Sequence, residues 1–273
     1  MKLEGKVAII TGGGRGIGKA VARAFAREGA YPCLVARTAA EVEAAAAEIG
    51  CALALTGDVS RLEDVERVVA AVMTRAGRVD VLVNNAGVQP PVGPLWENDP
   101  DEWLKTVLIN LGGVFLCCRS VLPHMIRRGR GKIINLSGGG AASPRPRFSA
   151  YAASKAAVVR LTETLAAELA DCNVQVNAIA PGAVNTGMLE EVLAAGAAAG
   201  EEALSKALEQ LKTGGVPAWA AAELAVFLAS EESGRLTGRL ISAVWDEWRS
   251  IPERIDRIMA GELYTLRRVS KGS

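Results

Sequence analysis

Tyr151 and Lys155 are the residues of this sequence whose types and spacing are best suited to chemistry. They lie four positions apart in a segment of good helix formers, so both side chains should share one helix face, one turn apart. A free phenol, with a pKa of about 10, exchanges protons poorly at neutral pH, but a neighbouring ammonium favours the phenolate. The pair therefore indicates a general acid/base. In isolation it would equally describe an interfacial Tyr beside a solvated Lys.

A glycine-rich turn close to the N-terminus is the second candidate. The motif TGGGRGIG, residues 11–18, joins a short apolar strand to an amphipathic helix. At such a junction, backbone N–H groups and the helix dipole can hold a pyrophosphate. Gly12, Gly16 and Gly18 give a spacing distinct from the general GxGxxG dinucleotide fingerprint. A plain tight turn would explain the glycines but not the strand and helix that flank them.

These motifs form part of an ordered set over residues 5–244: TGGGRGIG (11–18), NNAG (84–87), Asn110, YAASK (151–155) and Pro181-Gly182. The set resembles the classical short-chain dehydrogenase/reductase (SDR) family in order and spacing. The resemblance implies hydride transfer between a nicotinamide dinucleotide and a carbonyl or secondary alcohol of a small molecule.

The resemblance also implies roles for individual residues. Asn110, Ser137, Tyr151 and Lys155 would be catalytic, with Lys155 bound to the nicotinamide ribose and Asn110 holding a water that continues a proton relay. Residues 58–59 would border the adenine, residues 84–87 would support the cofactor floor, and residues 181–186 would lie by the carboxamide. The cofactor-binding set is then Gly12, Gly14, Arg15, Gly16, Ile17, Gly18, Ala36, Arg37, Asp58, Val59, Asn85, Ala86, Gly87, Asn110, Tyr151, Lys155, Pro181, Gly182, Val184 and Thr186.

The serine of the pattern is displaced. The family places a substrate-polarising Ser thirteen residues before the Tyr, where this chain has Gly138, preceded by Ser137. The flexible glycines 138–140 could return the Ser137 hydroxyl to within about 3 Å of the Tyr151 hydroxyl region. Ser143 is a competing candidate in the same loop. If no hydroxyl reaches the site, the chain could instead be a dinucleotide-binding regulator or sensor with weakened catalysis.

The end of the second strand points to the type of cofactor. NAD-binding folds of this kind place an acid there for the ribose hydroxyls, and this chain has Ala36. Arg37 follows, and Arg15 lies within the glycine loop, so two cations could converge on a 2′-phosphate. We therefore expect NADP(H) to be preferred, with NAD(H) possible.

Strands and helices alternate along the chain. Apolar strands are expected at residues 6–10, 32–36, 53–55, 79–83, 132–136, 174–179 and 240–244. Helices are expected at residues 17–28, 39–49, from Ser60 to about 77, 101–128, 150–170 and 223–230. Apolar strands separated by helices specify a doubly wound, Rossmann-type α/β fold with seven parallel strands and helices on both faces. No linker or repeat divides the chain, which predicts a single domain over residues 1–273.

Several local features carry their own predictions. Ser60 and Glu63 read as a capping box. Asn110 next to Gly112-Gly113 suits a helix interior poorly and predicts a local distortion. The segment 188–213 has few large apolar residues and is typical of a mobile lid, or of a simple exposed helix. The tail 245–273 begins with Trp245 and Trp248, which would pack on the substrate mouth or on another subunit.

Composition excludes several classes of function. The 273 residues carry a net charge of +1 and no long basic run, so nucleic acid is not expected as a partner. No run approaches a membrane span, and no apolar signal core follows Met1. Five cysteines without ligand spacing predict reduced thiols, no metal site and a cytoplasmic location.

The two longest helical segments predict self-association. Residues 101–128 and 150–170 carry small or apolar residues on more than one face, and a helix that is apolar all round must be buried. The residues concerned are Phe115, Leu116, Ala156, Val159 and Ala166. We expect a homo-oligomer, most simply a tetramer with two-fold axes, or else a dimer.

Overall fold

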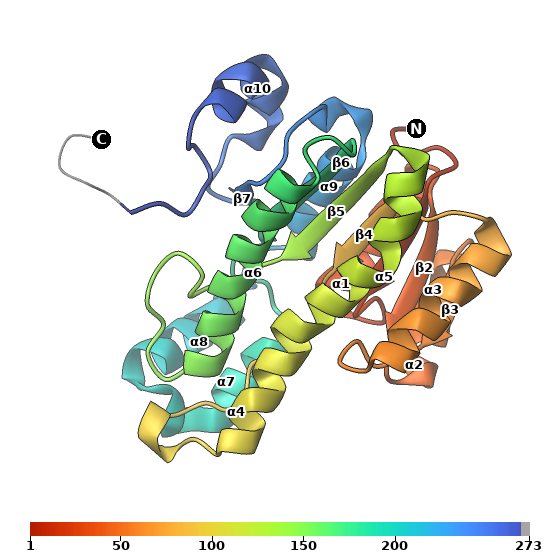
Figure 1. Ribbon diagram of the computed structural model, residues 1–273. Helices are drawn as coiled ribbons and strands as arrows, with labels where there is room; N and C mark the ends of the chain where they lie inside the picture. The colour runs from red at the N-terminus through yellow and green to blue at the C-terminus, as the bar shows by residue number, and fades with distance from the viewer. Residues whose placement is uncertain (269–273) are drawn as a thin grey trace.

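The computed structural model describes residues 1–268, and its centre is one seven-stranded sheet (Figure 1). The strand order is β3-β2-β1-β4-β5-β6-β7, and every neighbouring pair is parallel. The strands are β1 (Val7–Thr11), β2 (Tyr31–Ala36), β3 (Leu53–Thr56), β4 (Val81–Asn84), β5 (Gly131–Leu136), β6 (Val174–Ala180) and β7 (Leu240–Ser242). The predicted seven-stranded, doubly wound fold is confirmed.

Helices cover both faces of this sheet. They are α1 (Gly16–Arg27), α2 (Ala39–Ile49), α3 (Leu62–Ala76), α4 (Pro100–Val107), α5 (Gly113–Arg128), α6 (Ser149–Glu168), α7 (Gly187–Ala195), α8 (Glu201–Thr213), α9 (Ala218–Ala229) and α10 (Ile251–Ala260). Residues of α1, α2, α9 and α10 share one buried cluster with the sheet, and residues of α3, α5 and α6 share another.

Strand β1 shows why the strands read as continuous apolar runs. Ala8 and Ile10 belong to the first cluster, whereas Val7 and Ile9 belong to the second. Successive side chains of a strand point to opposite faces, so a strand covered on both sides must be apolar at every position.

The predicted distortion around Asn110 is present. Residues Leu108–Gly112 form a π-helical turn between α4 and α5, and Asn110 is fully buried within it. Such a turn lets a residue project at an angle that a regular helix would forbid. By length and composition alone the stretch Pro100–Arg128 could cross a membrane, but α5 packs on β4 and β5, as the core helix of a soluble protein would.

The capping prediction at Ser60 was wrong. Helix α3 begins at Leu62 after Arg61, and no side chain caps it. Ser60 lies one residue before the N-cap, and its hydroxyl instead donates to the Asp58 carboxylate at 2.7 Å. Local bonding of Ser to a preceding Asp competes with capping of the helix.

The tryptophans of the tail were predicted to pack on the substrate mouth or on another subunit, and Trp248 does neither. Its ring lies 5.6 Å from that of Phe227 in α9, and Trp248 is buried in the core of its own chain. Trp245 remains exposed. Strand β7 ends earlier than predicted because the Ser242 backbone N–H donates to Asp246, which turns the chain. Residues 269–273 of the predicted tail lie outside the described residues.

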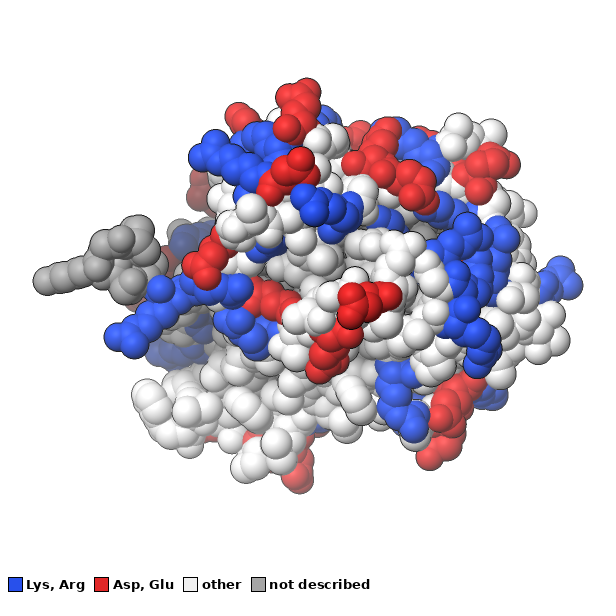
Figure 2. Space-filling model, turned by 45° about the horizontal axis from the view of Figure 1, so that its top comes forward, with Lys and Arg blue, Asp and Glu red and all other residues white. Residues whose placement is uncertain are grey.

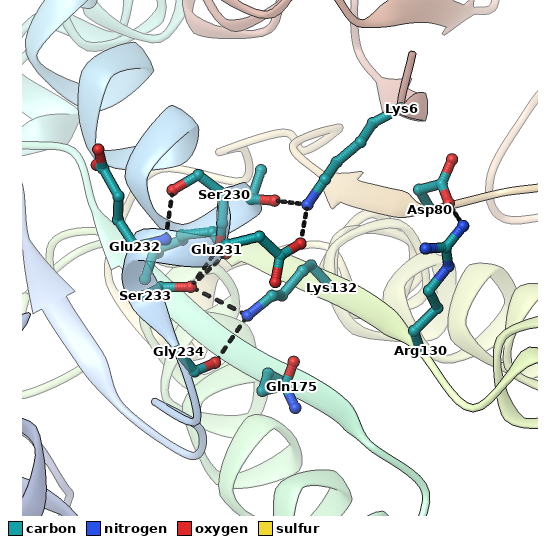
Figure 3. A network of polar contacts seen from close by, with 12 residues as sticks. Lys6, Asp80, Arg130, Lys132, Gln175, Ser230, Glu231, Glu232, Ser233 and Gly234 are labelled. Carbon is teal, nitrogen blue, oxygen red and sulfur yellow. Dashed lines mark hydrogen bonds and ion pairs between the residues drawn. The ribbon is translucent and has the colours of Figure 1, made fainter. Parts of the chain in front are cut away.

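The amino ends of the strands are held by polar contacts (Figure 3). Lys132 donates to the Ser233 hydroxyl at 3.1 Å and to the Gly234 backbone oxygen at 2.9 Å, while Lys6 pairs with Glu231 at 2.7 Å. Burial lowers the pKa of Lys132 to about 8. These contacts fix the turn that follows α9, residues 231–234, to the sheet. Elsewhere on the surface, cations and anions are interspersed over the face that Figure 2 presents.

Candidate active site

The candidate site residues gather at the carboxyl edge of the sheet. The segments that hold them follow β1, β2, β3, β4, β5 and β6, and parallel pairing brings these six strand ends to one edge. The strand order reverses direction between β1 and β4, and ligands of open α/β sheets bind in the crevice at that point. The site is therefore expected above β1 and β4.

The glycine loop after β1 fits a dinucleotide pyrophosphate. Gly12 and Gly16 adopt φ values of 65° and 53°, which residues with a side chain rarely adopt. A Cβ at Gly12 would lie 2.7 Å from the Asn85 amide nitrogen. Helix α1 then starts after Arg15, with no side-chain cap and no acid in its first turn, so its N–H groups remain available to an anion.

Thr11 and Asn85 lock this loop to the end of β4. The Thr11 hydroxyl oxygen accepts from the backbone N–H groups of Asn85 and Ala86, each at 3.0 Å. The Asn85 amide donates in return to the backbone oxygens of Thr11, at 2.9 Å, and Gly12, at 3.2 Å. Thr11 was part of the glycine motif but was not among the predicted site residues.

At the adenosine end, Ala36 closes β2 and Arg37 is exposed just beyond it. Asp58 and Val59 follow β3. Arg15, the other predicted cation, lies 3.8 Å from Glu41 of α2, an acid that the sequence interpretation did not consider. This acid partly balances the Arg15 charge, so Arg37 is the cation of the pair that has no ion-pair partner among residues 1–268.

A buried chain of polar side chains ties the middle of the sheet to α6. The Asn84 amide donates to the Asn135 side-chain oxygen at 2.9 Å, and the Asn135 amide donates to the Thr162 hydroxyl at 2.8 Å. All three side chains are buried. Buried polar contacts of this kind fix relative positions that apolar packing alone leaves adjustable, although the Asn84 side-chain oxygen has no partner among the described residues.

Asn110 and Lys155 meet beside Gly87. Asn110 bonds the backbone of Val88 twice, accepting from its N–H at 2.8 Å and donating to its oxygen at 2.9 Å, and it also donates to Ser154 at 3.0 Å. A Cβ at Gly87 would lie 3.1 Å from the Asn110 oxygen and 3.4 Å from the Lys155 ammonium. The Asn110 side chain is thus committed to protein partners.

Tyr151 and Lys155 lie on one face of α6, as predicted, and both are buried. The Lys155 ammonium lies 5.7 Å from the centre of the Tyr151 ring and donates to the Leu136 backbone oxygen at 2.8 Å. Burial raises the pKa of Tyr151, a nearby Arg145 lowers it, and Glu191 raises it further. Burial also lowers the pKa of Lys155 to about 8. Arg145 is thus a further cation beside the phenol, one that the sequence interpretation did not consider.

The segment after β6 covers this arrangement. Thr186 packs against the glycine loop, 3.3 Å from where a Gly16 Cβ would lie, and Val184 forms a β-bridge with Val216. Helices α7 and α8 follow, and their apolar residues share a buried cluster with Phe148 and Tyr151. The segment predicted as a lid therefore packs over the candidate acid/base.

Comparison with known proteins places the chain in a family. Residues 6–196 match the family model for short chain dehydrogenases. The 3beta-hydroxysteroid dehydrogenase 1 of Eggerthella lenta is 39% identical over 244 residues, covering 86% of this chain and 91% of that protein. The 3-oxoacyl-[acyl-carrier-protein] reductase FabG of Thermotoga maritima is 37% identical over 250 residues, covering 88% and 97%. The chain belongs to the short-chain dehydrogenase/reductase family.

Solved structures agree with this assignment. An NAD+-bound xylitol dehydrogenase matches with a TM-score of 0.83 and 30% identity, covering 89% of this chain and 98% of that one. A 3-ketoacyl-(acyl-carrier-protein) reductase from Brucella melitensis, complexed with NADH, matches with a TM-score of 0.79 and 36% identity, covering 88% and 97%. SDR proteins bind a nicotinamide dinucleotide, and the glycine loop described above fits that group.

The displaced SDR serine can now be located. The Ser137 hydroxyl donates to the backbone oxygen of Lys155 at 3.3 Å, so its hydrogen is directed to the protein. A Cβ at Gly138 would instead overlap the Tyr151 hydroxyl oxygen. Gly138, and not Ser137, is thus the residue whose side-chain position faces the phenol. Ser143, the competing candidate, is exposed.

Three residues near Tyr151 were missed by the sequence interpretation: Gln89, Arg145 and Glu191. Gln89 is buried and donates to the Met188 backbone oxygen at 3.2 Å, which ties the lid to the loop after β4. Arg145 lies over the Tyr151 ring at 5.2 Å, and Glu191 projects from α7. No motif marks these positions, because they come from loops and a helix that only the fold brings together. Among residues 1–268, no group of acidic, His and Cys side chains could hold a metal ion.

Replacing Ser137 by Ala tests its orientation. We expect turnover to fall by less than about threefold, because the hydroxyl donates to Lys155 rather than to a substrate oxygen, whereas loss of an oxyanion contact typically lowers kcat by about a hundredfold or more. Steady-state kinetics with any ketone that the wild-type protein reduces would measure this change in turnover. A hundredfold loss with unchanged cofactor binding would show that the hydroxyl turns to the substrate during catalysis.

Proposed function

We propose that this SDR protein transfers hydride between NADP(H) and a carbonyl or secondary alcohol of a small molecule. The observation that carries the proposal is the meeting of Asn110, Tyr151 and Lys155 at the carboxyl edge of the sheet, next to Gly87. Packing alone does not explain why a phenol and an ammonium are buried side by side, because both groups lose hydration there. Perturbed titratable groups in a covered site are typical of catalysis.

The residues of this chain would divide the work as follows. When bound, the nicotinamide supplies or accepts the hydride. The glycine loop and the start of α1 hold the pyrophosphate, and Lys155 lies where its ammonium can bind the nicotinamide ribose. Asn110 fixes the Val88 backbone and, through the π-helical turn, the geometry of the proton path.

Tyr151 would donate the proton during reduction. Burial raises its pKa, so the phenol carries its proton at neutral pH and can give it to the developing alkoxide. In the reverse direction the phenolate must form, which the positive charges of Arg145 and the oxidised nicotinamide favour. The lid segment 188–213 would exclude water from this exchange.

A dinucleotide-binding sensor is the second candidate. Gly138 and the direction of the Ser137 hydroxyl favour it, because both leave the site without the usual SDR hydroxyl. A panel of ketones and sugars with NADPH separates the two. Tight binding of NADPH, with no oxidation of NADPH in the presence of any of these substrates, would favour the sensor.

NADP(H) preference, self-association and location are further parts of the proposal. The absence of an acid at Ala36 and the positive charge of Arg37 favour a cofactor with a 2′-phosphate. The free cysteines favour a reducing, cytoplasmic location. We propose that residues 1–273 form one domain.

Self-association is supported by one surface of α4 and α5. Leu104, Leu108 and Phe115 are 59%, 51% and 52% exposed and lie along one side of these helices, beside Leu161 of α6. Val159 and Ala166, which were also predicted to face a partner, are buried within the chain itself. A second copy with the same stripe would cover this surface in a dimer or tetramer with two-fold symmetry.

Tyr151→Phe tests the acid/base assignment. We expect kcat to fall by roughly 10²- to 10⁴-fold, because the variant keeps the ring but cannot transfer a proton. Titration with NADPH and circular dichroism should match wild type. Turnover within tenfold of wild type would remove Tyr151 from this role.

Arg37→Ala tests the cofactor preference. We expect wild type to bind NADPH more tightly than NADH, and the variant to lose roughly 10- to 100-fold in NADPH affinity while NADH binding is unchanged, as suits one charge-assisted contact. Fluorescence titration measures both. Arg27→Ala, at the far end of α1, is the control. Tighter binding of NADH by wild type would contradict the preference.

Phe115→Glu tests the oligomer. A charge in the middle of an apolar interface should dissociate it, so the variant should sediment as a monomer at micromolar concentrations at which wild type is a dimer or tetramer. Leu208→Glu, on exposed α8, is the control and should leave the assembly intact. A monomeric wild type would refute the predicted assembly.

A further inference from the structure

Arg145 occupies the loop between β5 and α6 in a way that aims its guanidinium at the acid/base. The guanidinium carbon lies 4.0 Å from the centre of the Phe148 ring and 5.2 Å from the centre of the Tyr151 ring. Aromatic faces attract such a cation at this range. Figure 1 shows the chain entering α6 close to the lid helices α7 and α8.

The loop is built to hold this side chain in place. Arg145 lies between Pro144 and Pro146, each of which restricts the backbone, and its backbone oxygen accepts from the Phe148 N–H at 3.3 Å. A Cβ at Gly140 would lie 3.2 Å from the Arg145 Cβ and 2.7 Å from that of Ala152. The missing side chain at Gly140 therefore leaves space for the Cβ of Arg145.

The Arg145 guanidinium has no hydrogen-bond acceptor in the part of the chain that the structure describes. Within residues 1–268 it makes no hydrogen bond and no ion pair, and none of its nitrogens is among the buried atoms that lack a partner. The side chain is only partly buried, and the guanidinium carbon lies 5.2 Å from the centre of the Tyr151 ring. A half-buried guanidinium without an acceptor is unusual for a side chain with five donors and a permanent charge.

The surroundings define what could bind there. Phe148, Leu189 and Val192 give the site an apolar wall, and Gly138 leaves no side chain beside the Tyr151 hydroxyl. The acid that faces Tyr151 is Glu191, whose pKa burial raises, and Arg15 partly offsets its charge. Arg145 is therefore the group left to receive an anion.

We propose that Arg145 binds the carboxylate of the substrate, and that this SDR protein acts on 2-oxo acids, or the matching 2-hydroxy acids, with an apolar body. This rests on the proposed function. In a 2-oxo acid the carboxylate is bonded directly to the carbonyl carbon. When the carbonyl oxygen is hydrogen-bonded to Tyr151, the carboxylate therefore lies next to the reacting carbon, within reach of the guanidinium. An Arg fork matches two carboxylate oxygens, and this contact orients the carbonyl in place of the missing serine.

The reaction stays balanced in this assignment. The hydride and its electron pair form the new C–H bond at the carbonyl carbon, the C=O π pair moves to oxygen, and that oxygen takes the Tyr151 proton. The carboxylate keeps its charge throughout, so its contact with Arg145 is the same in ground state and transition state and should act mainly on KM. The separate effect of Arg145 on the pKa of Tyr151 would act on kcat with any substrate.

A matched pair of substrates tests the proposal. Wild type should reduce 2-oxo-4-phenylbutanoate with a higher kcat/KM than its ethyl ester, which has the same carbon skeleton without the charge. Arg145→Ala should raise KM for the acid by roughly 10- to 100-fold, the size expected for a charge-assisted contact, and change KM for the ester by less than about threefold. Any change in kcat that comes from the effect of Arg145 on Tyr151 should be the same for acid and ester, so the ratio of the two kcat/KM values isolates the carboxylate contact. Arg145→Lys, which keeps the charge but not the fork, should lie between the two.

Arg147→Asn is the control for charge in the same loop. Arg147 is exposed and adopts a φ of 72°, which Asn tolerates, so this variant should behave as wild type with both substrates. Three outcomes would overturn the proposal. In Arg145→Ala, KM could rise equally for acid and ester, or KM for the acid could stay unchanged. The wild-type protein could also reduce uncharged ketones and no 2-oxo acid.

A binding measurement separates this proposal from the function on which it rests. Calorimetry with 4-phenylbutanoate, which has no carbonyl to reduce, should show affinity for the wild-type complex with NADP+ that Arg145→Ala loses. Binding that depends on Arg145, without turnover of any ketone, would overturn the proposed oxidoreductase function and leave the carboxylate site. Equal binding by both proteins would overturn the site.

Discussion

Parallel pairing of all seven strands is the constraint on which the site depends. Because every strand points the same way, the loops after β1, β4, β5 and β6 meet at one edge, although their residues are distant in the sequence. The reversal of strand order between β1 and β4 opens the crevice there. The opposite edge carries contacts such as that of Lys132 with Ser233, which join the turn after α9 to the sheet.

Buried polar side chains turn this shared edge into a defined geometry. Thr11 and Asn85 join the glycine loop to β4, and Asn135 joins β4 to α6. Asn110 joins the π-helical turn to the loop at Val88. Each group is satisfied by a partner on another element, so a shift of one element would leave a buried donor or acceptor unpaired, which is costly.

The same burial sets the electrostatics around the acid/base. Removal from water raises the pKa of Tyr151 and lowers that of Lys155, so both charged forms are disfavoured before any ligand is considered. Arg145 opposes this effect on the phenol from a loop rather than from α6. Burial and Glu191 thus act on the pKa of this phenol in the direction opposite to the Arg145 guanidinium.

The sequence by itself determined the fold class, the family, the positions of most strands and helices, and the distortion at Asn110, because apolar period, turn residues and an ordered motif set are local signals. It also identified the helix face shared by Tyr151 and Lys155. Only the tertiary structure decided that Ser137 turns toward Lys155, that Trp248 packs in its own core, and that Arg145 and Glu191 face the phenol. Those outcomes depend on contacts between elements far apart in the chain, which no local pattern records.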